Sequence, residues 1–145
     1  LMQEGKQFLK DIFTKELQYM NGFNDVYPLL KNKYNIALVT STGPELVNHV
    51  DSLLSVVSKF DLHITSADVV KHKPNPEPYL MAMDRLQLKP YECIVIEDSI
   101  QGIKAGKAAG CYVIALEGSL DKKFLDKADD IISSFDALKK LLLKN

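Results

Sequence analysis

The chain has 145 residues, of which 46% are hydrophobic and 26% charged, as expected for one globular domain with a real core. Its formal net charge of −1 excludes the basic field of proteins that bind nucleic acid or an anionic membrane surface. No apolar run reaches the ~20 residues of a membrane span, and no signal peptide is visible. We therefore expect a cytoplasmic protein, with Cys93 and Cys111 as buried side chains in a reducing compartment. The first residue is Leu1 rather than Met, which suggests a start downstream of the natural one.

The N-terminal part of the chain is predicted to be helical. A helix is expected from Met2 to Met20, ended by Asn21-Gly22, and a second short helix from about Asn24 to Lys31. The first predicted strand is the apolar run from Asn35 to Thr40, and no strand is predicted before it. One side of the first helix would carry Phe8, Leu9, Ile12, Phe13 and Leu17.

The rest of the chain alternates between predicted strands and helices. Further strands are expected at Leu62–Thr65, Cys93–Ile96, Tyr112–Ala115 and Ile131–Ile132. Helices are expected after Ser41-Thr42-Gly43-Pro44, at Tyr79–Leu86, after Ser99 and at Phe135–Leu143. In the helix after Ser99, the glycines at 102, 106 and 110 would lie on one face or cap the helix, so that it can lie close against the sheet. This alternation predicts a Rossmann-like α/β fold, a three-layer sandwich with a mostly parallel sheet. Residues 1–20 are predicted to be a helical segment beside a core domain of residues 21–145.

Hydroxyl groups follow the first predicted strand. Thr40 and Ser41 stand where a hydroxyl and nearby backbone amides can hydrogen-bond a phosphoryl oxygen. The alternative is that Thr40 merely ends the strand, while Ser41 or Thr42 caps the next helix.

A rigid cationic loop follows the second predicted strand. Lys73 is followed by Pro74, Pro76 and Pro78, which forbid regular structure and stiffen the loop. A lysine held in this way can neutralise charge on a phosphoryl group. The alternative is an ordinary solvated surface lysine.

Two adjacent carboxylates end the apolar run that begins at Cys93. Glu97 and Asp98 would lie at the carboxyl edge of the sheet, where open α/β folds bind ligands. Paired carboxylates repel each other unless a cation lies between them, so they indicate a hard divalent metal, and Mg2+ is the one expected. The alternative is a helix N-terminus that favours negative charge.

Taken in chain order, these motifs resemble the haloacid dehalogenase (HAD) superfamily, in particular its β-phosphoglucomutase and phosphoglycolate phosphatase branch. The resemblance covers about Gly22 to Ala115. It rests on three motifs: Ile36-Ala37-Leu38-Val39-Thr40-Ser41, Lys73-Pro74-Asn75-Pro76 and Ile94-Val95-Ile96-Glu97-Asp98-Ser99. His72 replaces the glycine often found before the motif lysine.

This resemblance implies an α/β HAD-like core and a Mg2+-dependent phosphatase that acts on a small phosphorylated metabolite. Thr40 and Lys73 would be catalytic and, with Ser41, would hold the phosphoryl group, while Asp98 and Glu97 would bind magnesium. Family chemistry proceeds through an aspartyl-phosphate, in which a carboxylate attacks phosphorus and water then takes the phosphoryl group.

One family motif is absent from the chain. No Asp-x-Asp occurs in the sequence, so the nucleophile segment, the first central strand and most of the helical cap are predicted to be missing. We expect the chain alone to be inactive. Either the neighbouring strands close up, or another polypeptide completes the sheet, such as a partner chain or a second copy in a homo-oligomer, because unpaired buried backbone groups are costly.

Three alternatives to the phosphatase remain. The first is a sugar phosphomutase of the β-phosphoglucomutase type, and the second is a non-catalytic module that binds a phosphorylated ligand. The last is a different doubly wound protein, disfavoured because no glycine-rich loop follows an early strand.

Overall fold

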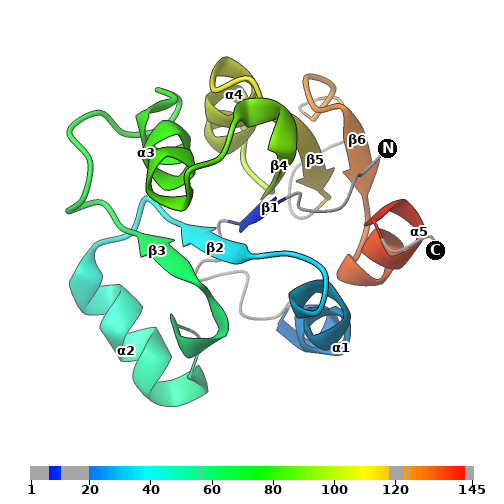
Figure 1. Cartoon of the computed structure of the whole chain (residues 1–145), viewed down its shortest axis with the longest axis horizontal. Helices are drawn as coiled ribbons and strands as arrows, with labels where there is room; N and C mark the ends of the chain where they lie inside the picture. Colours follow the sequence, from blue (N-terminus) through cyan, green and yellow to red (C-terminus); the bar gives the residue numbers. More distant parts are fainter. Residues whose placement is uncertain (1–6, 11–19, 56, 118–122, 124, 143–145) are drawn as a thin grey trace.

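A parallel sheet organises the molecule. The computed structural model describes residues 7–10, 20–55, 57–117, 123 and 125–142. Within these residues, six strands pair in parallel in the order β3-β2-β1-β4-β5-β6 (Figure 1). The strands are β1 (Gln7–Lys10), β2 (Ile36–Val39), β3 (Leu62–Ile64), β4 (Cys93–Glu97), β5 (Tyr112–Leu116) and β6 (Asp130–Ile132). The predicted α/β fold is confirmed, and each strand predicted after residue 30 is present.

The central position of the sheet is occupied by residues of the same chain. β1 lies between β2 and β4, with Lys10 opposite Leu38 on one side and Ile96 on the other. The predicted helix from Met2 to Met20 is therefore wrong for Gln7–Lys10, and its other residues except Met20 lie outside the described part. A helical pattern of apolar residues predicts a helix only weakly. Here the pairing of β1 with a strand on each side decides the conformation instead.

The predicted gap between β2 and β4, left by a missing central strand, is also wrong, because β1 lies there. Both strands form their ladders with β1, so the hydrogen bonds that an open gap would leave unmade are formed within the chain. The sheet therefore needs neither a partner's strand nor closure of β2 against β4. The domain boundary expected between residues 20 and 21 stays a prediction, although β1 joins the sheet of the second segment.

Helices cover both faces of the sheet and make it the middle of three layers (Figure 1). One face carries α1 (Met20–Lys31), α2 (Pro44–Leu54) and α5 (Leu138–Leu142), and the other carries α3 (Glu77–Leu86) and α4 (Ile100–Ala108). Short 3-10 turns, η2 (Val57–Lys59), η3 (Pro90–Glu92) and η5 (Phe135–Ala137), precede β3, β4 and α5. None of the helices in the described residues has the length and apolar character to cross a membrane.

Alternate residues of a central strand serve the two layers. In β4, Ile94 and Ile96 pack in the core beneath α1 and α5, whereas Cys93 and Val95 pack beneath α3 and α4. Both faces of the strand are thus dry, which explains its continuous apolar run. The same alternation places Glu97, the last residue of β4, on the side of α3 and α4.

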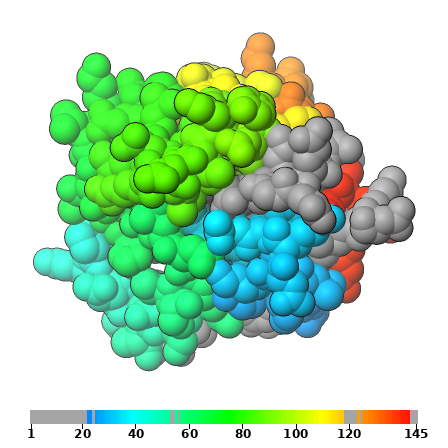
Figure 2. All heavy atoms as spheres, viewed as in Figure 1, coloured from blue at the N-terminus to red at the C-terminus, as the bar shows by residue number. Residues whose placement is uncertain are grey.

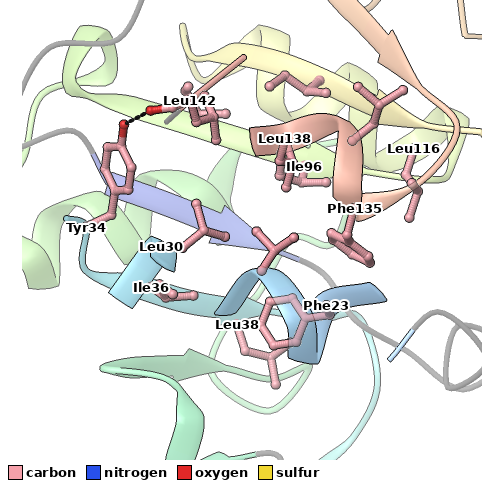
Figure 3. Packing of buried hydrophobic residues seen from close by; sticks show 14 of the residues in the cluster. Phe23, Leu30, Tyr34, Ile36, Leu38, Ile96, Leu116, Phe135, Leu138 and Leu142 are labelled. Atoms are coloured by element: carbon pink, nitrogen blue, oxygen red, sulfur yellow. Dashed lines mark hydrogen bonds between the residues drawn. The ribbon is translucent and has the colours of Figure 1, made fainter. Parts of the chain in front are cut away.

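One of the two cores lies between the sheet, α1 and α5 (Figure 3). The Phe23 side chain is fully buried, and its ring centre lies 5.5 Å from that of Phe135 and 6.0 Å from that of Phe60. At its margin, the Tyr34 hydroxyl donates to the Leu142 carbonyl at 2.9 Å. This bond ties the C-terminal helix to the segment that leads into β2.

Several helix boundaries differ from those predicted, and α3 begins at Glu77, two residues before the predicted Tyr79. α1 begins at Met20 rather than near Asn24, so Asn21-Gly22 lies inside the helix and does not end one. A Cβ added to Gly22 would lie 3.5 Å from the Phe135 Cβ, an ordinary contact. The closing helix is divided into η5 and α5, because its first turn adopts the tighter 3-10 form.

The loop between β3 and α3 carries the predicted proline-rich stretch. Its Lys73–Pro74 peptide bond is cis. In the space-filling view this loop and α3, both in green, form the surface above the turquoise α2 (Figure 2). The loop lies over the carboxyl ends of the strands, where the predicted polar residues gather.

Candidate functional site

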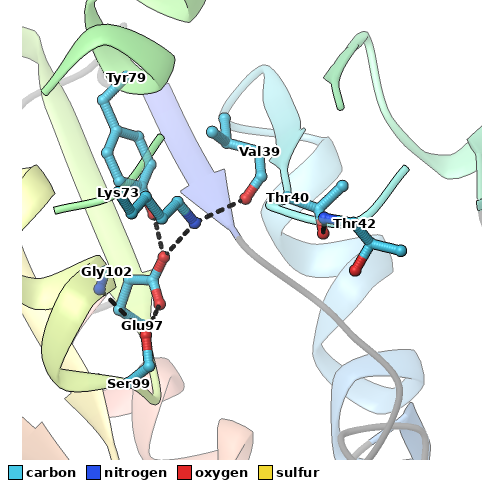
Figure 4. Close-up of polar contacts among 8 residues, drawn as sticks. All are labelled: Val39, Thr40, Thr42, Lys73, Tyr79, Glu97, Ser99 and Gly102. Carbon is cyan, nitrogen blue, oxygen red and sulfur yellow. Dashed lines mark hydrogen bonds and ion pairs between the residues drawn. The ribbon is translucent and has the colours of Figure 1, made fainter. Parts of the chain in front are cut away.

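The Lys73 ammonium is buried at the carboxyl edge of the sheet. The side chain is only 3% exposed, and Nζ donates to Glu97 Oε2 at 2.6 Å and to the Val39 carbonyl at 3.0 Å (Figure 4). It also lies 4.9 Å from the centre of the Tyr79 ring. The alternative of a solvated surface lysine is therefore wrong, because the loop turns this side chain inward.

These contacts join two strands just beyond the end of β1. The last residue of β1 pairs with Leu38 of β2 and Ile96 of β4. Val39 and Glu97 are the next residues of β2 and β4. Lys73 therefore links these two strands one residue beyond their last pairing with β1. The strand order reverses between β1 and β4, the place where open α/β sheets bind their ligands.

The Glu97 carboxylate is fully buried and accepts hydrogen bonds from three side chains. Lys73 and the Tyr79 hydroxyl both donate to Oε2, the latter through a short contact, and Ser99 Oγ donates to Oε1 at 3.3 Å (Figure 4). Such pairing is what makes a buried charge tolerable.

Helix α4 begins directly over this carboxylate. A Cβ added to Gly102 would lie 2.0 Å from both Cδ and Oε1 of Glu97, far inside any real contact distance. Ser99 is the N-cap of the helix, and its Oγ accepts from the Gly102 N–H at 3.0 Å. The predicted close approach is confirmed at Gly102, where its reason is the buried carboxylate, and at Gly106, where an added Cβ would lie 2.8 Å from Val113 Cγ2. Gly110 lies beyond the end of α4, with a positive φ of 87°.

Thr40 follows β2 at the same edge of the sheet. Its side chain is buried, its N–H donates to the Ile64 carbonyl at 2.9 Å, and its Oγ1 accepts from the Thr42 N–H at 3.1 Å. Ser41 is exposed beside it. The alternative that Ser41 or Thr42 caps the next helix is wrong, since the N-cap of α2 is Gly43. Phosphate binding by Thr40 and Ser41 stays a prediction.

Asp98 is one of the two residues predicted to bind magnesium. This residue is half-buried and directly follows Glu97, whose oxygens are already engaged by Lys73, Tyr79 and Ser99. Among the residues that the structure describes, no cluster of three or more His, Cys, Asp and Glu is placed to hold a metal ion. Magnesium often takes only one or two protein carboxylates and completes its shell with phosphate and water. Asp98 fits such a site, whereas Glu97 would first have to exchange its donors.

The structure thus brings some of the predicted residues into direct contact, whereas others lie next in the chain to a residue that Lys73 contacts. Lys73 and Glu97 are in contact, and Thr40 and Asp98 each follow a residue that Lys73 holds. Sequence reasoning missed Tyr79, which it placed in a helix without a role. The sequence shows a tyrosine near the start of the helix that follows the proline-rich loop. This position alone does not indicate that the side chain contacts Glu97 at the end of β4.

This fold and geometry define a class of protein: a doubly wound α/β protein with a polar site where the strand order reverses. The chain belongs to the haloacid dehalogenase-like hydrolase family, whose model matches residues 2–116. The predicted resemblance is therefore confirmed, and it extends nearer to the N-terminus than expected.

Three relatives illustrate this membership. Hexitol phosphatase A of Escherichia coli is 36% identical over 78 residues, which are 54% of this chain and 36% of that protein. The crystal structure of β-phosphoglucomutase from Clostridium difficile superposes with a TM-score of 0.73 at 28% identity, over 85% of this chain and 53% of that one. CbbY from Rhodobacter sphaeroides, solved in complex with phosphate, gives a TM-score of 0.71 at 26% identity, over 81% and 54%. The chain thus spans about half or less of each relative's length.

Proposed function

We propose that the chain is the core of a phosphatase that binds the phosphoryl group of a small metabolite at the carboxyl edge between β2 and β4. The observation that carries this proposal is the buried Lys73 ammonium, fixed by Glu97 and the Val39 carbonyl where the strand order reverses. Family membership and the names of the phosphatase and phosphomutase relatives support it. A phosphomutase is the closest variant, because it starts from the same phosphoryl-binding site.

Each residue of the site has a distinct part in this proposal. Lys73 would donate to a phosphoryl oxygen, with Thr40 and Ser41 contributing hydroxyl or backbone N–H donors. Glu97 would keep the ammonium in place from the buried side. The Asp-x-Asp nucleophile of the family's aspartyl-phosphate chemistry does not occur in these 145 residues. We therefore expect phosphate binding without turnover by this chain alone.

Charge balance supports a magnesium site. The positive charge of Lys73 is already matched by Glu97 at 2.6 Å, and Asp98 adds a further negative charge beside them. Magnesium commonly binds through one or two carboxylates together with phosphate oxygens and water. Magnesium held by Asp98 would neutralise charge on the phosphoryl group when bound.

The test combines a binding and an activity measurement on the 145-residue chain. Inorganic phosphate, titrated with magnesium present and followed by 31P NMR, should bind to the wild type and lose most of its affinity in Lys73→Met. Lys107→Met is the surface control, because Lys107 pairs with Asp129 on the surface and should leave phosphate binding intact. Both variants are compared under conditions in which each is folded. p-Nitrophenyl phosphate should not be turned over. Equal phosphate affinity in both variants, or none in the wild type, would refute the site.

A non-catalytic module that binds a phosphorylated ligand is the second candidate. The observation that favours it is the absence of Asp-x-Asp from the chain. Phosphate binding by these residues would be common to both candidates. A longer product of the same gene with Asp-x-Asp after an apolar strand, and turnover by that product, would decide for the enzyme.

A further inference from the structure

Tyr79 contacts both charged partners of the site from its buried side. The residue lies near the start of α3 and is fully buried, and its hydroxyl donates to the same Glu97 oxygen as Lys73 does. The Lys73 ammonium lies 4.9 Å from the centre of its ring (Figure 4). Tyr79 thus provides a hydrogen-bond donor to the carboxylate and an aromatic face to the cation.

We infer that Tyr79 positions Lys73 for phosphate binding, an inference that rests on the proposed function for its consequence. The Tyr79 hydroxyl fixes Oε2 of Glu97, and that oxygen in turn fixes the lysine. Tyr79 needs no contact with the phosphate and acts through the other two residues. It is therefore a positioning residue rather than a catalytic one.

Two physical effects give this arrangement its strength. The hydrogen bond and the ion pair are shielded from water, because the Lys73 and Glu97 side chains are 3% and 0% exposed, so both interactions act in a low local dielectric. The ring face attracts the ammonium and leaves it fewer orientations. A long lysine side chain in a loop would otherwise retain most of its rotamer freedom.

A purely structural role for Tyr79 makes a different prediction. A buried tyrosine that only fills the core would stabilise the fold and leave the behaviour of the ammonium unchanged when its hydroxyl is removed. Tyr34 provides the matched control, since it is also buried and its hydroxyl donates to the Leu142 carbonyl at 2.9 Å in the other core. Tyr34→Phe and Tyr79→Phe each remove a hydroxyl that donates a buried hydrogen bond.

The experiment follows the Lys73 ammonium by NMR in lysine-labelled protein, with its signal identified by its absence from Lys73→Arg. In Tyr79→Phe we expect the Lys73 Nζ and Cε signals to move and the exchange of the ammonium protons to become about fivefold faster, the effect of one typical hydrogen bond on an equilibrium. Phosphate affinity should fall by a similar factor. Tyr34→Phe should leave all three quantities at their wild-type values.

The outcomes separate this inference from the proposed function. If Tyr79→Phe leaves the Lys73 signals and exchange unchanged, the positioning role is overturned. If the Lys73 signals move while the wild type binds no phosphate, the positioning of the ammonium stands and the phosphate site fails. Should Tyr79→Phe not fold, the wild type still tests the geometry. The Tyr79 ring should shift the Lys73 Hε signals upfield, and a Lys73 Hε at its ordinary position would overturn the inference.

Discussion

Lys73 and Glu97 form an ion pair of 2.6 Å with almost no exposure, between a loop and a strand end that lie 24 residues apart in the chain. Both charges have left water, so neither side chain is tolerable there without the other. This pair connects the stability of the fold to the site, because the same contact holds the lysine at the carboxyl edge of the sheet.

Removal of one partner should therefore be far more costly than loss of a surface pair. We expect Lys73→Met to lower the free energy of unfolding by about 3–5 kcal/mol, because it leaves Glu97 as an uncompensated buried charge. Addition of Glu97→Gln to that variant should recover part of the loss. Lys107→Met, which breaks a pair with side chains 40% and 28% exposed, should cost about 0–1 kcal/mol. Urea unfolding of all four proteins measures this, and equal costs for the two lysines would contradict it.

Gly102 should resist substitution even by the best helix former. An alanine Cβ there would collide with a carboxylate that Lys73, Tyr79 and Ser99 hold in place. We expect Gly102→Ala to destabilise the protein by about 1–3 kcal/mol or more, although helix propensity alone favours alanine by about 1 kcal/mol.

The matched control for Gly102 is the glycine in α1. At Gly22 the added Cβ would make only an ordinary contact with Phe135, at 3.5 Å, so Gly22→Ala should be neutral or stabilising. Denaturant titrations of both variants give the comparison. A Gly102→Ala protein as stable as Gly22→Ala would mean that α4 does not approach Glu97 this closely.

How far the sequence predicts this fold depends on how much of each element is encoded locally. β2 and β4 are buried on both faces, so their continuous apolar runs predict them correctly. Gln7–Lys10 has no such run and lies within a helical pattern. Its strand form depends on pairing with β2 and β4, which lie far along the chain. Local pattern carries no information about such partners.

The site shows the same limit. The three motifs around Thr40, Lys73 and Glu97 are visible because each follows or flanks a predictable strand. That Lys73 pairs with Glu97, and that Tyr79 donates to it, depends on how the loop and α3 pack over the sheet. Sequence spacing fixes neither the direction of the lysine side chain nor the face of the helix that meets the strand end.

Acid should weaken the fold through aspartates that anchor the starts of strands. Burial alone would raise the pKa of Asp61, but the hydrogen bonds from Lys31 and from the Ile36 N–H, with the Lys31 charge, outweigh it and leave the pKa below its ordinary value. The pKa of Asp129 is lowered in the same way: its burial is outweighed by Lys107 and the Val113 N–H.

A carboxyl group with a lowered pKa in the folded state stabilises the protein above its unfolded-state pKa, and this contribution is lost as the pH falls through the folded-state pKa. The urea midpoint should therefore decline below about pH 4. Asp61→Asn should start from a lower midpoint near neutrality and decline less steeply, and Lys31→Met should do the same through loss of the partner. An Asp61→Asn profile parallel to that of the wild type would show that this carboxylate makes no such contribution.

Magnesium should bind at Asp98 and should do so more tightly when phosphate is present. Asp98 is the carboxylate that directly follows the engaged Glu97, and magnesium commonly completes its shell with phosphate oxygens and water. At magnesium concentrations about ten times its Kd, the free energy of unfolding should rise by about 1.4 kcal/mol and return to its starting value with EDTA. Mn2+ as a paramagnetic substitute should broaden the NMR signals around Asp98 and Ser99 first. In Asp98→Asn the stabilisation and the localised broadening should both disappear, whereas Asp126→Asn, an exposed aspartate before β6, should retain them. Stabilisation that survives Asp98→Asn, or broadening spread evenly over exposed carboxylates, would remove Asp98 from the metal site and leave the phosphate to be neutralised by other groups.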